Sequence, residues 1–369
     1  MMGDMEIPAL YAPCRLCPRR CGVMRRAFSA EPPGYCGEGA GLRLACASIH
    51  RGEEPPLTGK GGSGTIFVSG CNLGCVFCQN RQISSGPRRD PGAAGRRGPE
   101  GGPPPGPLGR LVDTDEIARI CLALQRRGAE NINIVTGSHA VPALVEGIAA
   151  ARRGPAPGNG GTAGGPLSIP VLWNSSAYEV PETLELLSGT VEVFLPDLKT
   201  LDSALAEQYY NASNYPETAA AAIRKMLTLR RLRVEKWEGG TESMVSGVMV
   251  RHLVLPGHLG STRKVLRWFA EHCAGQALLS LMFQYTDMAA VYPADSSFRR
   301  TGPKRRISEA EYHTVLNWLG EYGLEDGYCQ DPPGRDPAAD ARWLPDFERT
   351  NPFSSELSTP VWHWREGFV

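Results

Sequence analysis

The chain has 369 residues, 41% of them hydrophobic, which is enough for a sizeable core in one large domain or two ordinary ones. Its 39 basic residues balance its 39 acidic ones, and this argues against a nucleic-acid-binding protein, which normally carries a basic surplus. No apolar run approaches the ~20 residues of a membrane span, so we expect no membrane segment. Residues 1–13 lack a secretory pattern, so we expect a cytoplasmic protein with reduced thiols. Eleven cysteines in that compartment favour metal or cluster binding.

Strand-like and helix-like segments alternate along the chain. Short apolar and β-branched runs predict six strands, at 65–69, 131–135, 170–174, 191–195, 249–255 and 279–283. Helical spacing of apolar residues predicts helices at 113–127, 141–152, 181–187, 216–230, 261–272 and 308–322. This alternation predicts an α/β fold of parallel strands, either an incomplete barrel or an open doubly wound sheet. In both architectures ligands bind at the C-terminal ends of the strands.

Two segments rich in glycine and proline interrupt the pattern, at 86–107 and 154–166. They lack the hydrophobic residues that a core needs, so we expect disordered surface insertions. We therefore predict a Cys-rich N-terminal region at 1–60, one barrel domain at 61–330 that contains both insertions, and a C-terminal tail at 331–369.

Three cysteines follow the first predicted strand closely. Cys71, Cys75 and Cys78 have the spacing C-x3-C-x2-C, and Gly74 between them permits a tight turn. Three thiolates are one fewer than the four that close a cubane or a structural zinc site. The spacing therefore predicts a metal centre with one position open to a small molecule; the alternative is a zinc knuckle whose fourth ligand lies elsewhere.

This cysteine motif resembles the signature of the radical S-adenosylmethionine (SAM) superfamily. The resemblance implies a [4Fe-4S] cluster on the three cysteines, with SAM bound at the open iron. It also implies that a reductant such as flavodoxin or ferredoxin supplies one electron, and that the resulting 5′-deoxyadenosyl radical abstracts a hydrogen atom. The family fold is a six-stranded partial (β/α) barrel of TIM type. Phe77 occupies the position of the family's aromatic residue beside the adenine.

Later segments resemble the activating enzymes of glycyl-radical enzymes, most closely the branch related to pyruvate formate-lyase-activating enzyme. Asp197-Leu198-Lys199 matches that branch directly, and residues 250–257 resemble its Arg-x-x-Val-x-Pro-Gly stretch. The chain departs from the branch at 135–139, where the branch has Gly-Gly-Glu, and at the end of the sixth strand, where it has a histidine. The resemblance implies a glycyl-radical enzyme or another protein as partner. It assigns SAM binding to Thr136, Gly137, Ser138, Asn174, Asp197, Lys199, Arg251 and Gln284.

These polar residues also have a purely structural interpretation. Asp197 can accept hydrogen bonds from ribose hydroxyls, and Lys199 and Arg251 can bind a carboxylate. The alternative is a buried ion pair between Asp197 and one of the two cations.

Four further cysteines lie within 23 residues near the N-terminus. They are enough for one closed site, for which structural zinc and a second [4Fe-4S] cluster are both candidates. A set of reduced, buried thiols is the alternative, and Cys46 could replace one ligand. The four residues are Cys14, Cys17, Cys21 and Cys36.

We therefore predict a radical SAM oxidoreductase of the glycyl-radical-activase type. One alternative is a radical SAM enzyme that acts on a small molecule or on a different protein residue. The other is an iron–sulfur or zinc protein without turnover.

Overall fold

The computed structural model describes residues 10–25, 34–84, 107–154, 165–236, 242–288, 302–331, 343–354 and 356–369. The strands are β1 (Leu42–His50), β2 (Ser63–Val68), β3 (Arg110–Val112), β4 (Ile132–Val135), β5 (Val171–Ser175), β6 (Val193–Pro196), β7 (Arg233–Lys236), β8 (Glu242–Leu253), β9 (Leu278–Met282), β10 (Gly327–Cys329), β11 (Ser358–His363) and β12 (Gly367–Phe368). The helices are α2 (Pro55–Thr58), α3 (Arg81–Ser84), α4 (Thr114–Arg126), α5 (Val141–Arg153), α6 (Pro181–Leu186), α7 (Ser203–Tyr210), α8 (Tyr215–Leu229), α9 (Leu259–His272) and α11 (Glu309–Glu321).

The centre of the sheet consists of parallel strands in the order of the chain. β2, β4, β5, β6, β8 and β9 pair in sequence, each parallel to the next, and β10 continues beside β9. A doubly wound sheet would reverse its strand order at a switch point, and this sheet does not. Helices α4, α5, α6, α8 and α9 connect these strands. The predicted α/β fold is confirmed as a partial barrel. Among the described residues, β10 and β12 are the first and last strands in the order of pairing, and they do not pair with each other to close the sheet.

The helix boundaries follow from local capping chemistry. The Asp113 side chain accepts a hydrogen bond from the Glu116 N–H at the start of α4. Ser308 and Glu311 form a complete capping box at the start of α11. Proline lies in the first two positions of α5, α6 and α8, where it does not cost a helical hydrogen bond. These caps confirm the helix starts that the sequence predicts.

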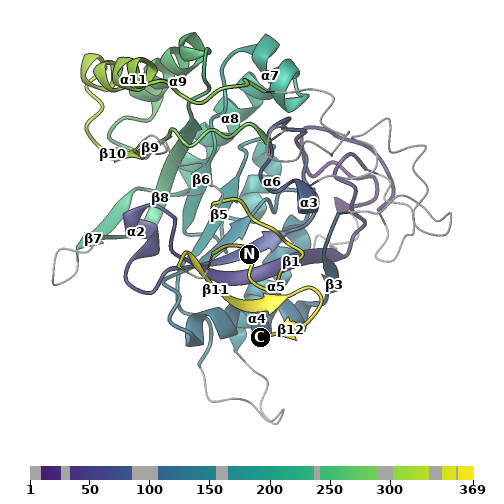
Figure 1. Cartoon of the computed structure of the whole chain (residues 1–369). Helices are drawn as coiled ribbons and strands as arrows, with labels where there is room; N and C mark the ends of the chain where they lie inside the picture. The colour runs from purple at the N-terminus through teal and green to yellow at the C-terminus, as the bar shows by residue number, and fades with distance from the viewer. Residues whose placement is uncertain are drawn as a thin grey trace.

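Both ends of the described chain contribute strands that the sequence analysis did not predict. β1 pairs antiparallel with β2, and β11 pairs antiparallel with β1 on its other side. Figure 1 shows the yellow β11 and β12 beside the purple β1. Segments from the predicted N-terminal region and C-terminal tail thus extend the same sheet, and the three-part division of the chain stays a prediction.

The main core lies between the parallel strands and their helices, and Trp173, Phe194 and Phe269 are fully buried there. Most of the two predicted insertions lies outside the described residues. In the part of the chain that is described, no helix is long and apolar enough to cross a membrane.

Candidate active site

The cysteine loop after β2 lines a cavity of about 330 Å³ at the C-terminal ends of the parallel strands. The backbone N–H of Gly74 donates to the Tyr210 carbonyl at 3.1 Å, and the N–H of Val76 donates to the Tyr209 carbonyl at 3.0 Å. The end of α7 therefore holds the loop in place. A Cβ atom on Gly74 would lie 2.7 Å from the Tyr35 hydroxyl, so a larger residue would push the loop outward. Cys71, Cys75 and Cys78 all face the cavity.

The donor set of this loop fits a cluster with one open iron. The Leu73 N–H lies 3.4 Å from the Cys71 sulfur, and the Ser84 hydroxyl lies 3.3 Å from the Cys78 sulfur. Hydrogen bonds of this kind tune the potential of iron–sulfur clusters. Among the described residues, no group of three or more His, Cys, Asp or Glu could hold a single metal ion. A cubane binds each cysteine to a different iron, so it suits three thiols that are spread around a cavity.

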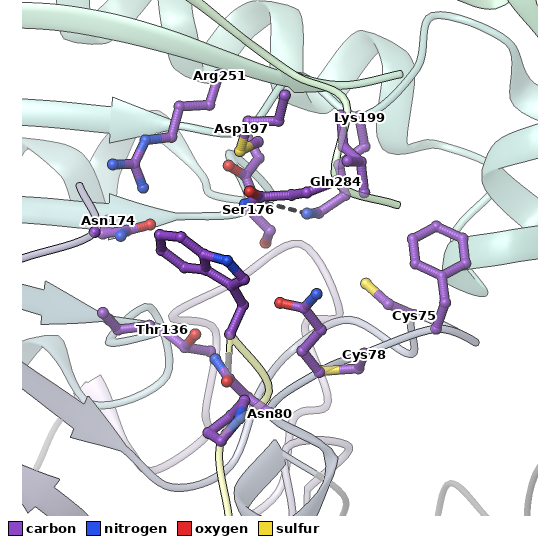
Figure 2. Close-up of a pocket in the computed structure, with 18 of the residues that line it drawn as sticks. Cys75, Cys78, Asn80, Thr136, Asn174, Ser176, Asp197, Lys199, Arg251 and Gln284 are labelled. Carbon is purple, nitrogen blue, oxygen red and sulfur yellow. Dashed lines mark hydrogen bonds and ion pairs between the residues drawn. The ribbon is translucent and has the colours of Figure 1, made fainter. Parts of the chain in front are cut away.

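The side chains predicted after β6 form an ion pair within the same cavity. The Lys199 Nζ lies 2.7 Å from the Asp197 carboxylate, as the dashed line in Figure 2 shows. Burial favours the neutral form of Lys199, but the negative charge of Asp197 outweighs this effect and raises the pKa of Lys199 well above its ordinary value. The ion pair that the sequence analysis offered as an alternative therefore exists, and both residues still line the cavity.

An aromatic cluster forms one wall. The Phe77 ring lies 5.2 Å from the Tyr285 ring, edge to face, and 5.8 Å from the Tyr210 ring. Phe77 and Gln284 line the cavity together with Tyr285. This wall provides an apolar, aromatic surface of the kind on which a purine ring stacks.

Of the three residues that follow β4, one lines the cavity and the other two do not. Thr136 lines the cavity with a left-handed backbone (φ 66°), which is unusual for a β-branched residue, and its N–H donates to the Asn174 carbonyl at 2.9 Å. Gly137 and Ser138 are not among the lining residues. A Cβ atom on Gly137 would lie 2.6 Å from the Trp173 ring. Asn174 also lines the cavity, beside Thr136.

Ser138 instead contacts a buried carboxylate that the sequence analysis missed. Glu179 is fully buried and accepts hydrogen bonds from Ser138 at 2.9 Å, Trp173 at 2.6 Å and Ser175 at 2.7 Å. Burial raises the pKa of Glu179, although the three hydrogen bonds oppose the shift. This residue ties the loop after β4 to the end of β5 and so fixes the backbone that carries Thr136 and Asn174.

Arg251 lines the cavity, but its guanidinium is already bound by two other carboxylates. It forms ion pairs with Glu53 and Glu54, which lie between β1 and α2. Ser280 donates a further hydrogen bond to Glu54 at 2.6 Å. The sequence analysis missed both glutamates. The available signal was a charged residue within a buried strand, which requires a partner but does not identify it.

The four N-terminal cysteines surround a second, much smaller cavity of about 10 Å³. The Arg25 guanidinium lies 3.8 Å from the Cys14 sulfur, and the Tyr35 N–H lies 3.4 Å from the Cys21 sulfur. Burial raises the pKa of Cys17 to about 12 and also raises that of Cys36. Cys46 does not join them, because it is buried on β1 in a separate hydrophobic cluster.

The donor set of these four cysteines suits either zinc or a cubane, but their arrangement matches neither directly. The space between them is about that of one water molecule, so a cubane would require the segment to open. A single ion would require the thiols to move closer together, since they form no mononuclear set in the described structure.

Known proteins that resemble this chain include members of the family that the cysteine motif indicates. The model of the radical SAM superfamily matches residues 65–267, more than half of the chain. The uncharacterized protein MJ0674 of Methanocaldococcus jannaschii is 27% identical over 325 residues, which cover 86% of this chain and 77% of that protein.

Two solved structures are similar at low identity. SuiB of Streptococcus suis, bound to the precursor peptide SuiA, is 11% identical with a TM-score of 0.43 over 71% of this chain. The match covers 46% of SuiB, so the chain spans less than half of that protein. A domain of pyruvate-formate lyase-activating enzyme from Bacteroides vulgatus is 15% identical with a TM-score of 0.31, over 44% of this chain and 82% of that domain.

The matched range contains all three cysteines of the loop after β2, and the structure gathers them at the C-terminal ends of a partial barrel. By this match, the chain belongs to the radical SAM superfamily.

Proposed function

We propose that this chain is an oxidoreductase that cleaves SAM reductively and abstracts a hydrogen atom from a second molecule. One observation carries the proposal: three thiols of one loop share a cavity with the Asp197–Lys199 ion pair and an aromatic wall. When bound at Cys71, Cys75 and Cys78, a [4Fe-4S] cluster supplies the electron that splits SAM into methionine and a 5′-deoxyadenosyl group.

The residues of the chain bind and orient SAM in this proposal. Phe77 and Tyr285 offer an aromatic face to the adenine, and the Asp197 carboxylate accepts hydrogen bonds from ribose hydroxyls. Lys199 binds the carboxylate of SAM, while Thr136 and Asn174 supply polar groups for the amino acid part. The half-buried cavity limits the access of water to the reactive group.

For the target we propose a backbone glycine of a partner enzyme, as the resemblance of residues 196–199 and 250–257 to glycyl-radical-enzyme activases implies. A flavodoxin- or ferredoxin-type protein is the proposed electron donor. We also propose a cytoplasmic location, a compartment in which the eleven cysteines stay reduced.

The test is an anaerobic assay of SAM cleavage. The full chain is loaded with iron and sulfide, reduced, and mixed with SAM, and 5′-deoxyadenosine is quantified by chromatography. We expect product from wild type and from Cys121→Ala, whose cysteine is buried in α4 and lines neither of the two cavities. Product that persists in Cys71→Ala would contradict the proposal, as would a loaded, reducible wild-type cluster that gives none.

We propose further that Cys14, Cys17, Cys21 and Cys36 hold a second metal centre. What supports this is that all four thiols line one cavity. Metal analysis of the purified chain distinguishes the two forms: about one zinc per chain supports a structural ion, and about four additional irons support a second cluster. Equal metal content in wild type and Cys17→Ala would contradict a metal at these cysteines.

A further inference from the structure

The side of the cavity away from the cysteines is built from charged groups. Arg251 lies between Glu53 and Glu54, and each glutamate has one further partner, Asn133 for Glu53 at 2.9 Å and Ser280 for Glu54. In Figure 2, Arg251 and Asn174 lie on the opposite side of the cavity from Cys75 and Cys78. A molecule held between the two sides therefore contacts both.

The cavity carries one more negative charge than positive. Among the described residues that line it, three carboxylates (Glu53, Glu54 and Asp197) face two cations (Lys199 and Arg251). The pKa of Glu54 is lowered, because the charge of Arg251 and its hydrogen bonds outweigh the opposing effect of burial. Burial lowers the pKa of His50, so its imidazole is neutral and does not balance the excess. An uncompensated charge in a buried site is costly, and a cationic ligand removes the cost.

Polar atoms next to this charge lack partners. His50 lines the cavity, and only 9% of its surface is exposed. The Nδ1 atom of its imidazole is buried and has no hydrogen-bond partner. The Nε of Arg251 is likewise buried and unpaired. Buried polar groups in folded proteins normally have partners. The Nδ1 of a neutral His50 can accept a hydrogen bond from a cationic N–H group, whereas the Nε–H of Arg251 can only donate one.

Aromatic rings complete this side of the cavity. The Phe353 ring lies 4.8 Å from the His50 ring, and Trp343 lines the cavity while 40% exposed. Aromatic faces attract cations, and they exclude competing water from around them.

We propose that the Glu53–Glu54–Arg251 side of the cavity binds a cationic nitrogen group, a primary ammonium or guanidinium, of the molecule whose hydrogen is abstracted. This rests on the proposed function. The group forms its ion pair with Glu53, the less buried of the two carboxylates, with exposed side-chain fractions of 13% for Glu53 and 6% for Glu54. Such a group comes either from a free amine or from a lysine or arginine side chain of a protein.

The test is a binding titration on the iron- and sulfide-loaded full chain in the presence of SAM. The probes are 1,5-diaminopentane, the peptide acetyl-Gly-Lys-Gly-amide and its neutral analogue with norleucine in place of lysine. We expect a cationic probe to bind at least about tenfold tighter than the neutral peptide, which is the effect of one charge-assisted contact. Preference for the diamine indicates a small amine, and preference for the lysine peptide indicates a protein.

Three variants make the test specific. Glu53→Gln abolishes the preference for cationic probes, Glu53→Asp retains part of it, and Glu182→Gln on α6 leaves it unchanged; thermal unfolding verifies that each variant is folded. Equal binding of cationic and neutral probes to wild type overturns the inference. So does a Glu53→Gln variant that weakens SAM binding but not probe binding, because the excess charge then serves SAM. Formation of 5′-deoxyadenosine by wild type, measured in parallel, shows whether the proposed function itself holds.

Discussion

The two cysteine segments have nearly the same spacing and very different surroundings. Cys14, Cys17 and Cys21 follow C-x2-C-x3-C, and the loop after β2 follows C-x3-C-x2-C. With Cys36, the first set has four thiols around a space of about 10 Å³, whereas the second has three thiols on a cavity of about 330 Å³. Four ligands close a metal site and three leave a position for a reactant. The two segments therefore differ in the number of thiols and in the space beside them much more than in their spacing, and on this difference we base the proposal of one closed and one open site.

The two segments also contact each other directly. The Arg19 side chain, between two N-terminal cysteines, donates from Nε to the carbonyl of Asn72 at 2.9 Å, and Asn72 lies next to Cys71. The N-terminal segment therefore supports the loop that we propose to be catalytic.

The largest expected effect separates the two sets of cysteines. Cys75→Ala removes one of the three ligands that we propose for the open site, so we expect SAM cleavage to fall to the background rate. Cys14→Ala leaves all three ligands in place, so cleavage persists within about tenfold of wild type. The amount of 5′-deoxyadenosine and the iron content of the two variants are the measurements. Equal losses of product in both variants would contradict the proposal that one set of cysteines forms an open site and the other a closed one.

The next effect concerns the Asp197–Lys199 ion pair, which lines the larger cavity. Lys199→Met leaves Asp197 without its partner and removes a cation from the cavity, so SAM affinity falls about 10- to 100-fold. Lys225→Met is the matched control, since Lys225 pairs with the exposed Glu185 on the surface. Titration of SAM into both variants measures the difference. Unchanged affinity in Lys199→Met would show that the pair is only structural.

A smaller effect tests the packing behind Thr136. Gly137→Ala places a Cβ atom 2.6 Å from the Trp173 ring and 2.7 Å from Leu144, so we expect a loss of about 1–3 kcal/mol in the free energy of unfolding. Gly189→Ala is the control, because nothing lies within 4 Å of its added Cβ. Urea unfolding compares the two. Equal stability would mean that the loop after β4 moves freely.

The smallest effect concerns the contact between the segments. Arg19→Met removes the hydrogen bond to Asn72 and the packing of the guanidinium 3.8 Å from the centre of the Tyr35 ring. We expect about 1–2 kcal/mol less stability and a reduction in SAM cleavage below tenfold, with metal retained at both sites. The exposed Arg15→Met is the control. A loss as large as that of Cys75→Ala would mean that the two sites act as one.

Local patterns predicted the barrel well, because its parallel strands are short apolar runs that alternate with helices of regular apolar spacing. Asp113 and Ser308 mark helix starts through contacts three residues away, which a sequence displays directly. The pairing of β1 with β11 was missed because it joins segments from opposite ends of the chain. Long-range pairing depends on the whole fold and leaves no local signal.

The residues of the candidate site also fall into a group that the sequence predicts and a group that it does not. The resemblance named residues at the strand ends, and Thr136, Asn174, Asp197, Lys199 and Gln284 all line the cavity. It could not reveal Glu53, Glu54 or Glu179, since these carboxylates act through partners that are distant in sequence or hidden in the core. Glu53 and Glu54 also lie outside residues 65–267, the range that matches the family model.

Electron paramagnetic resonance of the reduced cluster, with and without SAM, tests the central claim most directly. The Cys14→Ala variant is the best sample, because any signal from the N-terminal cysteines is removed or altered. If Cys71, Cys75 and Cys78 hold a cluster with one open iron, SAM changes the spectrum of the Cys14→Ala variant. The Cys75→Ala variant then shows no spectrum that responds to SAM. A cluster spectrum that SAM does not alter would contradict an open site.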